Sequence, residues 1–257
     1  MAPAPSPSLV PRLRTARAVV FDTDGVITDS ARVHAAAWKE AFDPCLAEAG
    51  QRRPFDPVED YRRYVDGKSR LDGAADFLTS RGLRPADETV EAVAAAKERL
   101  FVRRLREHGI EAWPGTVRLL RMLRAQGVPC AAVSASRHAP ELLDRSGVRE
   151  LFQAVVDGNE AARLRLPGKP DPALFLEAAR RLGVPAGEAA VVEDALAGVE
   201  AGRRGGFGLV VGVDRTAGPT SAADLHEHGA DLVVGDLAEL MTGQSIGQSF
   251  GQDIGED

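Results

Sequence analysis

The sequence is poor in cysteine, in long apolar runs and in basic charge, and each shortage excludes a class of protein. Its 257 residues contain only two cysteines, Cys45 and Cys130, too few for a disulfide framework in a chain of this length. Its apolar runs are far shorter than the roughly 18 residues that a membrane-spanning helix needs. A net charge of -6 lacks the basic excess that is typical of nucleic-acid binders. We therefore expect a cytoplasmic protein, monomeric, that binds neither membrane nor nucleic acid.

The two ends of the chain differ in composition from a packed domain. The opening stretch MAPAPSPSLVPR is rich in Pro and Ala and lacks the apolar run of a secretory signal. The closing stretch TGQSIGQSFGQDIGED is a low-complexity run with a Gly-Gln near-repeat. We expect residues 1–14 to form a disordered lead and residues 241–257 a disordered tail.

Short apolar runs indicate strands that are buried on both faces of a parallel sheet. They span residues 18–21, 130–133, 154–156, 189–192, 209–211 and 232–234. Segments with helical periodicity lie between them at 116–127, 139–147 and 171–183. This alternation predicts an α/β fold, with a Rossmann-like, doubly wound parallel sheet as its core, over residues 15–34 and 110–240.

Residues 35–109 show a different pattern. Helix-like segments occur there at 35–46, 70–82 and 88–109, and no run reads as a convincing strand. Pro114 and Gly115 mark the turn at which the chain returns to the core. The sequence thus predicts a small all-helical cap domain, inserted after the first strand.

Polar side chains follow the predicted strands where ligands bind in an open parallel sheet, at the carboxyl ends. Asp22 and Asp24 follow the first strand, Ser134 to Ser136 the second, and Glu193 with Asp194 the fourth. Lys169 precedes another core helix. Carboxylates can act as nucleophile and hold a hard cation, while hydroxyls and an amine bind phosphate. These residues are therefore the parts that phosphoryl transfer needs.

Each of these signals has a plainer interpretation when it is taken alone. The two aspartates suit a solvated turn, and the Glu193–Asp194 pair suits the N-terminus of a helix. Ser134 suits a helix N-cap, and Lys169 suits a solvated surface. Their occurrence together, each next to a predicted strand or helix end, favours a site.

The string FDTDGVITDS, followed in order by Ser134, Lys169 and Glu193–Asp194, resembles the haloacid dehalogenase superfamily of phosphatases and phosphomutases. The resemblance covers roughly residues 17–236 and is greatest to the β-phosphoglucomutase-like branch, which has a helical cap. It implies that Asp22 is the nucleophile and that Asp24 is the general acid/base. It also implies that Ser134 holds a phosphoryl oxygen and that Lys169 neutralises charge.

The same resemblance implies Mg²⁺ as the cofactor, held by Asp22, Asp24 through its backbone carbonyl, Glu193 and Asp194. It also implies substrate-binding positions on both sides of the site: His34, Gly67, Arg70, Lys97, Ala135, Ser136 and Arg137, with His138 beside them. Two residues depart from the family pattern. Asp66 stands where a sugar phosphomutase has a lysine, and Thr23 stands where Leu or Met is usual.

The predicted activity is Mg²⁺-dependent phosphoryl transfer, through an aspartyl-phosphate, on a small phosphorylated sugar. Interconversion of hexose 1- and 6-phosphates, of the β-phosphoglucomutase type, is the favoured form. A phosphatase that acts on a sugar phosphate or another small metabolite would use the same catalytic residues and stays open. A catalytically idle binding domain is the least favoured, because the set of catalytic residue types is intact.

Overall fold

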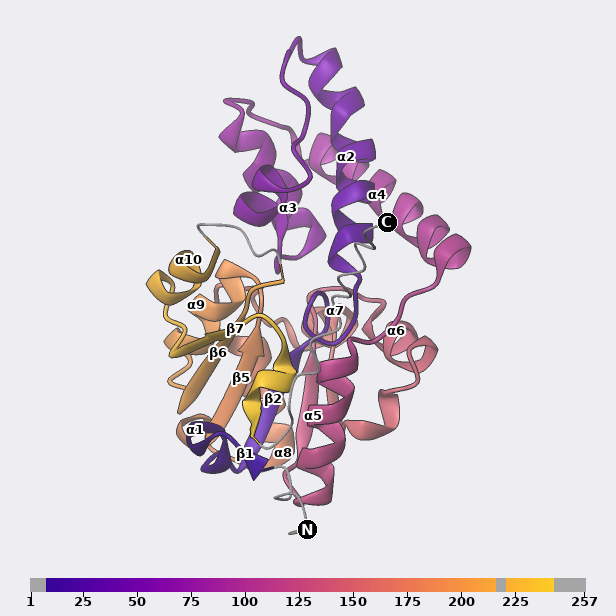
Figure 1. The fold of residues 1–257 in the computed structure, drawn as a ribbon. Helices are drawn as coiled ribbons and strands as arrows, with labels where there is room; N and C mark the ends of the chain where they lie inside the picture. The colour runs from indigo at the N-terminus through magenta and orange to yellow at the C-terminus, as the bar shows by residue number, and fades with distance from the viewer. Residues whose placement is uncertain (1–7, 216–220, 243–257) are drawn as a thin grey trace, which may run out of the picture.

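The computed structural model describes residues 8–215 and 221–242 (Figure 1). At its centre is a six-stranded parallel sheet in the order β4-β3-β2-β5-β6-β7. Its strands are β2 (Ala18–Asp22), β3 (Cys130–Val133), β4 (Ala154–Val156), β5 (Ala189–Glu193), β6 (Leu209–Val213) and β7 (Leu232–Val234). Each predicted apolar run is a strand, and the predicted α/β, Rossmann-like class is confirmed.

Helices cover both faces of the sheet because successive strand residues point to opposite sides. Phe21 of β2 packs on the face that carries α5 (Pro114–Ala125), and Val20 packs on the opposite face. That second face carries α8 (Ala173–Leu182) and α9 (Leu196–Arg204). The other core elements are α6 (Ala139–Arg145), α7 (Gly158–Leu164), α10 (Ser221–Glu227) and the 3₁₀ turns η2 (Arg149–Leu151), η3 (Ala186–Glu188) and η4 (Leu237–Leu240).

A helical cap lies above the carboxyl-end edge of the sheet (Figure 1). It consists of α2 (Ala31–Glu48), η1, a π-helical turn (Tyr61–Val65), α3 (Arg70–Ser80) and α4 (Asp87–His108). Aromatic rings fill its interior: the centroid of Phe42 lies 4.8 Å from that of Trp38 and 4.3 Å from that of Phe77. Residues 31–108 are all described and contain no strand.

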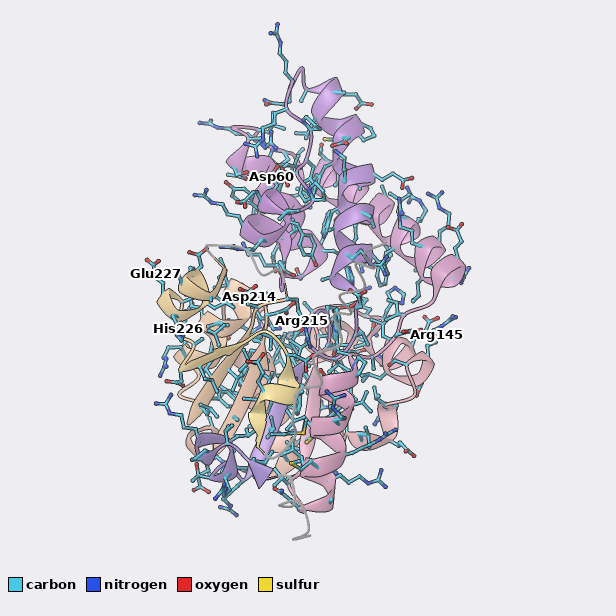
Figure 2. All side chains as sticks on the ribbon, in the orientation of Figure 1. Asp60, Arg145, Asp214, Arg215, His226 and Glu227 are labelled. Atoms are coloured by element: carbon cyan, nitrogen blue, oxygen red, sulfur yellow. The ribbon has the colours of Figure 1, made fainter. Side chains whose placement is uncertain are left out.

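A buried carboxylate helps to hold the cap together. Asp60 is only 5% exposed, and its Oδ2 accepts hydrogen bonds from Arg81 at 2.7 Å and from the amide of Asp56 at 2.9 Å. Figure 2 shows Asp60 within the cap, well above the sheet. Among the described residues, no helix has the length and apolar character that a membrane crossing requires.

The expected division between core and cap, after residue 34, lies within a helix of the structure. Helix α2 begins at Ala31, so a division after residue 34 falls inside its first turn. Helix α5 also begins earlier than expected, at Pro114, because proline lacks the N–H that a first helical position cannot use. His34 consequently lies on the first cap helix and close to the sheet.

The expectation of a disordered lead over residues 1–14 and a disordered tail over 241–257 is wrong for residues 8–14 and 241–242. Ser8 and Leu9 form β1, which pairs antiparallel with β8 (Met241–Thr242), and α1 (Pro11–Arg14) follows. Leu9 and Leu13 are almost fully buried against the core. Burial of these two leucines outweighs the loop-like local composition. The remainder of the expected lead and tail, residues 1–7 and 243–257, lies outside the described residues.

Candidate active site

The predicted catalytic side chains meet at one edge of the sheet. Asp22 ends β2, Glu193 ends β5, Ser134 follows β3, and Lys169 lies on the loop before α8. In the sheet β2 lies between β3 and β5. The connection after β2 crosses one face of the sheet and the connection after β5 crosses the other, so ligands have access between these strand ends.

Lys169 is buried between two carboxylates. Its amine donates hydrogen bonds to Oδ1 of Asp22 and, at 2.6 Å, to Oε1 of Glu193. Burial opposes the positive charge, but the two carboxylates raise the pKa of Lys169 above its ordinary value. Burial raises the pKa of Asp22, and Lys169 offsets part of that effect. Lys169 is therefore a fixed cation beside Asp22, and not a surface lysine.

Asp24 accepts three side-chain hydrogen bonds. Its Oδ1 is 2.5 Å from Ser30 Oγ and 3.1 Å from His34 Nε2, and its Oδ2 is 2.9 Å from Ser134 Oγ. Burial works against the charged form, but His34 and the two hydroxyls lower the pKa of Asp24 well below its ordinary value. Asp24 is thus held as a carboxylate.

A buried pair from the cap supports Asp24. Lys97 Nζ lies 2.7 Å from His34 Nδ1. Since an ammonium group can only donate, Nδ1 accepts and the His34 proton lies on Nε2, which donates to Asp24. Burial and the neighbouring Lys97 lower the pKa of His34, and burial lowers the pKa of Lys97 to about 8. The cap therefore contacts the Asp24 carboxylate through His34 of α2, whose ring Lys97 of α4 orients.

Three acidic side chains offer a place for a divalent cation. One ligand atom each of Asp22, Glu193 and Asp194 lies within 4.8 Å of the others. Asp194 Oδ1 is buried with no hydrogen-bond partner, and burial with nearby carboxylates raises the pKa of Asp194. Glu193 already holds Lys169 and the amide of Ala195. A buried carboxylate oxygen that has no hydrogen-bond partner and lies near two other carboxylates suits Mg²⁺. Asp22 and Asp194 have the side chains most available to bind the ion.

Gly25 permits this arrangement. It has a φ of 85°, and a β-carbon there would lie only 1.8 Å from Oδ2 of Asp194. Glycine alone adopts this backbone conformation readily and leaves the space empty. The Asp194 carboxylate therefore packs directly against the backbone that follows Asp24.

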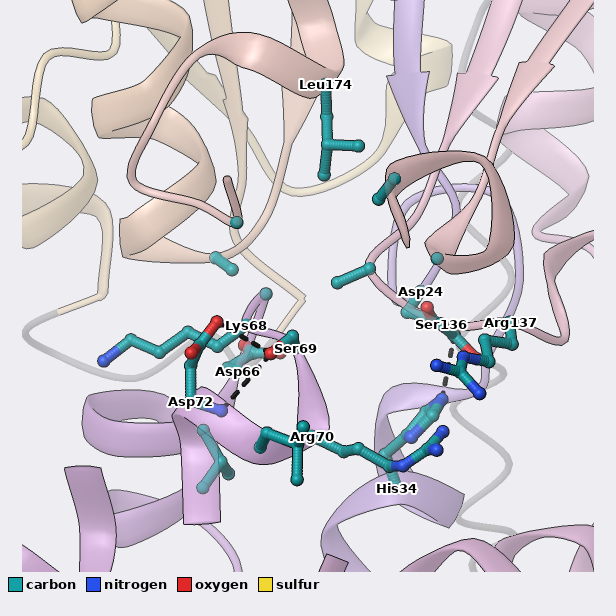
Figure 3. A pocket seen from close by; sticks show the side chains of 18 of the residues that line it. Asp24, His34, Asp66, Lys68, Ser69, Arg70, Asp72, Ser136, Arg137 and Leu174 are labelled. Carbon is teal, nitrogen blue, oxygen red and sulfur yellow. Dashed lines mark hydrogen bonds and ion pairs between the residues drawn. The ribbon is translucent and has the colours of Figure 1, made fainter. Parts of the chain in front are cut away.

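The cap supplies the other wall of the site. Gly67 packs over Ala195, where a β-carbon on Gly67 would lie 2.9 Å from that of Ala195. In Figure 3 the Arg70 side chain extends from the cap toward His34, and Arg137 reaches the same region from the core. A cavity of about 260 Å³ lies between these walls.

The structure brings the predicted site residues together. The lining of the cavity includes Asp22, Asp24, His34, Gly67, Arg70, Lys97, Ala135, Ser136, Arg137 and Asp194. Ser134, Lys169 and Glu193 are buried beside it and bonded to Asp24, to Asp22 or to one another. His138 is tied to the cavity through Glu98.

Sequence reasoning missed several lining residues, among them Tyr61 and Glu98. Tyr61 hydrogen-bonds to Asp66, which also lines the cavity; burial and nearby carboxylates raise the pKa of Asp66 to about 7. No motif surrounds Tyr61 or Glu98. The one available signal for Glu98 was its position next to Lys97, which does not indicate a shared cavity, because consecutive helical residues point in different directions.

Comparisons with known proteins give a consistent result. The family described as haloacid dehalogenase-like hydrolase matches residues 16–206. The chain is 44% identical over 239 residues to the beta-phosphoglucomutase of Mycobacterium bovis, covering 88% of this chain and 91% of that protein. It is 28% identical over 199 residues to a phosphorylated carbohydrates phosphatase of Thermotoga maritima, covering 76% and 84%. A crystal structure of beta-phosphoglucomutase from Clostridium difficile matches with a TM-score of 0.71 and 25% identity, covering 88% and 93%.

Proposed function

Because the chain belongs to the haloacid dehalogenase-like hydrolase family, with phosphomutases and phosphatases among its relatives, we propose that it transfers phosphoryl groups through Asp22. The substrate is a small sugar phosphate, and Mg²⁺ is the cofactor. The reaction that the site supports best is interconversion of hexose 1- and 6-phosphates. The observation that carries this proposal is a cavity with carboxylates in one part and the cations Arg70 and Arg137 in another.

The first half-reaction begins at Asp22. One carboxylate oxygen bonds to phosphorus while the bond from phosphorus to the departing sugar oxygen breaks. That oxygen takes from Asp24 the proton that Asp24 accepted from a sugar hydroxyl in the other half-reaction. Lys169 and the amide of Asp24 each bond to Asp22 and hold its carboxylate in one orientation. Bound Mg²⁺ would offset the repulsion between Asp22, Asp194 and the phosphate.

The second half-reaction uses Asp24 as a base. A sugar hydroxyl oxygen bonds to phosphorus, the bond from phosphorus to Asp22 breaks, and the hydroxyl proton moves to Asp24. The hydrogen bonds that lower the pKa of Asp24 keep it ready to accept this proton. A protein that already carries phosphate on Asp22 therefore starts its cycle with Asp24 deprotonated, as the base of this half-reaction must be.

The cationic part of the cavity favours a mutase over a phosphatase. A substrate with phosphate at Asp22 and a second phosphate near Arg70 and Arg137 spans the cavity and presents a hydroxyl in place of water. The phosphatase alternative rests on the relative from Thermotoga maritima and on the fact that water can use the same residues.

One experiment separates these functions. Hexose 1-phosphates are supplied with Mg²⁺ and a trace of hexose bisphosphate, and isomer exchange and phosphate release are measured on the same sample. The proposal predicts exchange well in excess of release. Release without exchange would establish the phosphatase, and neither activity on any phosphorylated sugar would favour an idle domain.

A further inference from the structure

Glu98, on the cap helix α4, lines the cavity but has no part in the proposed chemistry. Its side chain is 28% exposed. Its Oε1 accepts a hydrogen bond at 2.6 Å from Nε2 of His138, and its Oε2 lies 3.6 Å from Nη1 of Arg70. His138 belongs to the core, at the N-terminus of α6, whereas Arg70 begins α3 in the cap. One carboxylate thus joins cationic groups from both sides of the cavity.

The charges of this group fit an ion pair. The hydrogen bond from His138, with the positive charges around it, lowers the pKa of Glu98 to about 2. The same bond raises the pKa of His138. Within the described residues, neither Arg70 nor His138 forms an ion pair with Asp22, Asp24 or Asp194. The two cationic groups are therefore not paired with these aspartates. Glu98 is the anion that contacts both of them, while Oε2 of Glu141 lies 3.6 Å from Nδ1 of His138.

A phosphate group suits the same donors. It carries up to two negative charges and three acceptor oxygens, and arginine binds phosphate and carboxylate in similar geometry. A ligand phosphate that reaches Arg70 and His138 must displace Glu98, because two anions at one pair of donors repel each other. We propose that Glu98 is an exchangeable internal anion, which pairs with Arg70 and His138 in the free protein and yields them to the far phosphate of the substrate.

This role rests on the proposed function. A bisphosphate that serves both half-reactions has to leave the cationic groups and return with its two ends exchanged. Glu98 pairs again with Arg70 and His138 each time the phosphate departs, so release does not leave Arg70 without an anionic partner. Glu98 is accordingly a positioning residue that acts through Arg70 and His138, and it lowers the affinity for the far phosphate.

The test measures binding separately from turnover. Asp22→Asn provides a background in which the bisphosphate is not consumed, and Glu98→Gln is added to it. Affinity for glucose 1,6-bisphosphate with Mg²⁺ is measured by calorimetry, and dissociation by stopped flow. We expect binding to tighten about three- to tenfold, with most of the change in the dissociation rate. Glu91→Gln, an exposed change on the same helix, removes the same charge and should leave binding unaltered.

Weaker or unchanged binding with Glu98→Gln overturns the inference, since Glu98 would then only hold Arg70 in place. Equal tightening in the Glu91→Gln control also overturns it, because the effect would be one of net charge. If the Asp22→Asn protein binds no bisphosphate while remaining folded, the proposed function fails, and the inference fails with it. That result is distinct from normal binding that Glu98→Gln does not change.

Discussion

The amine of Lys97 and Nδ1 of His34 lie 2.7 Å apart in the buried space between cap and core. Because Lys97 donates, the ring must present its Nε2 proton to Asp24. Lys97 comes from α4 and His34 from α2, so the contact depends on how the two cap helices pack together. The cap thereby sets the tautomer of the group that supports the acid/base residue.

His34→Ala tests this link. Asp24 loses the hydrogen-bond donor from the cap that fixes the orientation of its carboxylate toward a sugar hydroxyl. We expect isomer exchange to fall about ten- to a hundredfold, with a smaller loss of slow phosphate release. His226→Ala, at an exposed position on α10, is the control and should change neither rate. Equal loss of both activities in His34→Ala would contradict the link.

Lys169→Met leaves Asp22 and Glu193 buried without their cation. Breaking a buried ion pair from one side destabilises a protein by about 3–5 kcal/mol, so urea unfolding at pH 7 should show a loss of this size. The ordinary pKa of Asp22 is 3.8, and its folded value, already raised, rises further without Lys169. The loss should therefore shrink as the pH falls and Asp22 takes up a proton.

The matched control is Lys39→Met, which removes a half-exposed amine from an i,i+4 pair with Asp43. Such pairs contribute about 0.3–0.5 kcal/mol. A loss in Lys169→Met no greater than in this control would mean that Lys169 does not hold the two carboxylates.

Asp194→Asn separates metal binding from folding. Without metal, the variant should be more stable than the wild type, because it removes a buried charge whose pKa is raised by burial and by other acids. The increase in melting temperature that Mg²⁺ gives the wild type should largely disappear. Asp144→Asn, at an exposed position on α6, should retain that increase. An undiminished Mg²⁺ response in Asp194→Asn would exclude Asp194 as a ligand.

Arg62→Ala probes the closure of the cap. Arg62 of the cap pairs with Asp224 of α10, and both side chains are partly exposed, so the pair contributes about 1 kcal/mol or less. Hydrogen exchange should become faster in residues 66–70, where Gly67 packs over Ala195, and should stay slow in β2. Arg63→Ala removes an exposed neighbour and should change neither. Unaltered exchange over residues 66–70 would show that this pair does not hold the cap closed.

The sheet and most of the site could be predicted from sequence because the necessary signals are local. Strands buried on both faces read as short apolar runs, and parallel strands bring their carboxyl ends to one edge. Asp22, Ser134 and Glu193 are far apart in sequence, but each is at or next to the end of such a run. Their meeting therefore follows from the fold class.

The features that sequence reasoning missed depend on contacts between distant segments. Leu9 and Leu13 are ordered because residues near Leu240 cover them, and nothing in the Pro-rich opening stretch indicates that partner. The start of α2 at Ala31 was missed although Ser30 is of a type that favours an N-cap, and in the structure its hydroxyl donates to Asp24. Glu98 has a role in the cavity only because α4 faces both Arg70 and His138.

The central claim, that Asp22 carries the phosphoryl group, is tested by rapid acid quenching with hexose bisphosphate and Mg²⁺, followed by peptide mass analysis. We predict one added phosphoryl group on the peptide that contains Asp22, its loss when a hexose monophosphate is supplied, and none in Asp22→Asn. Turnover should fall about a thousandfold or more in that variant. Continued turnover in folded Asp22→Asn, or a phosphoryl group on another residue, would contradict the account.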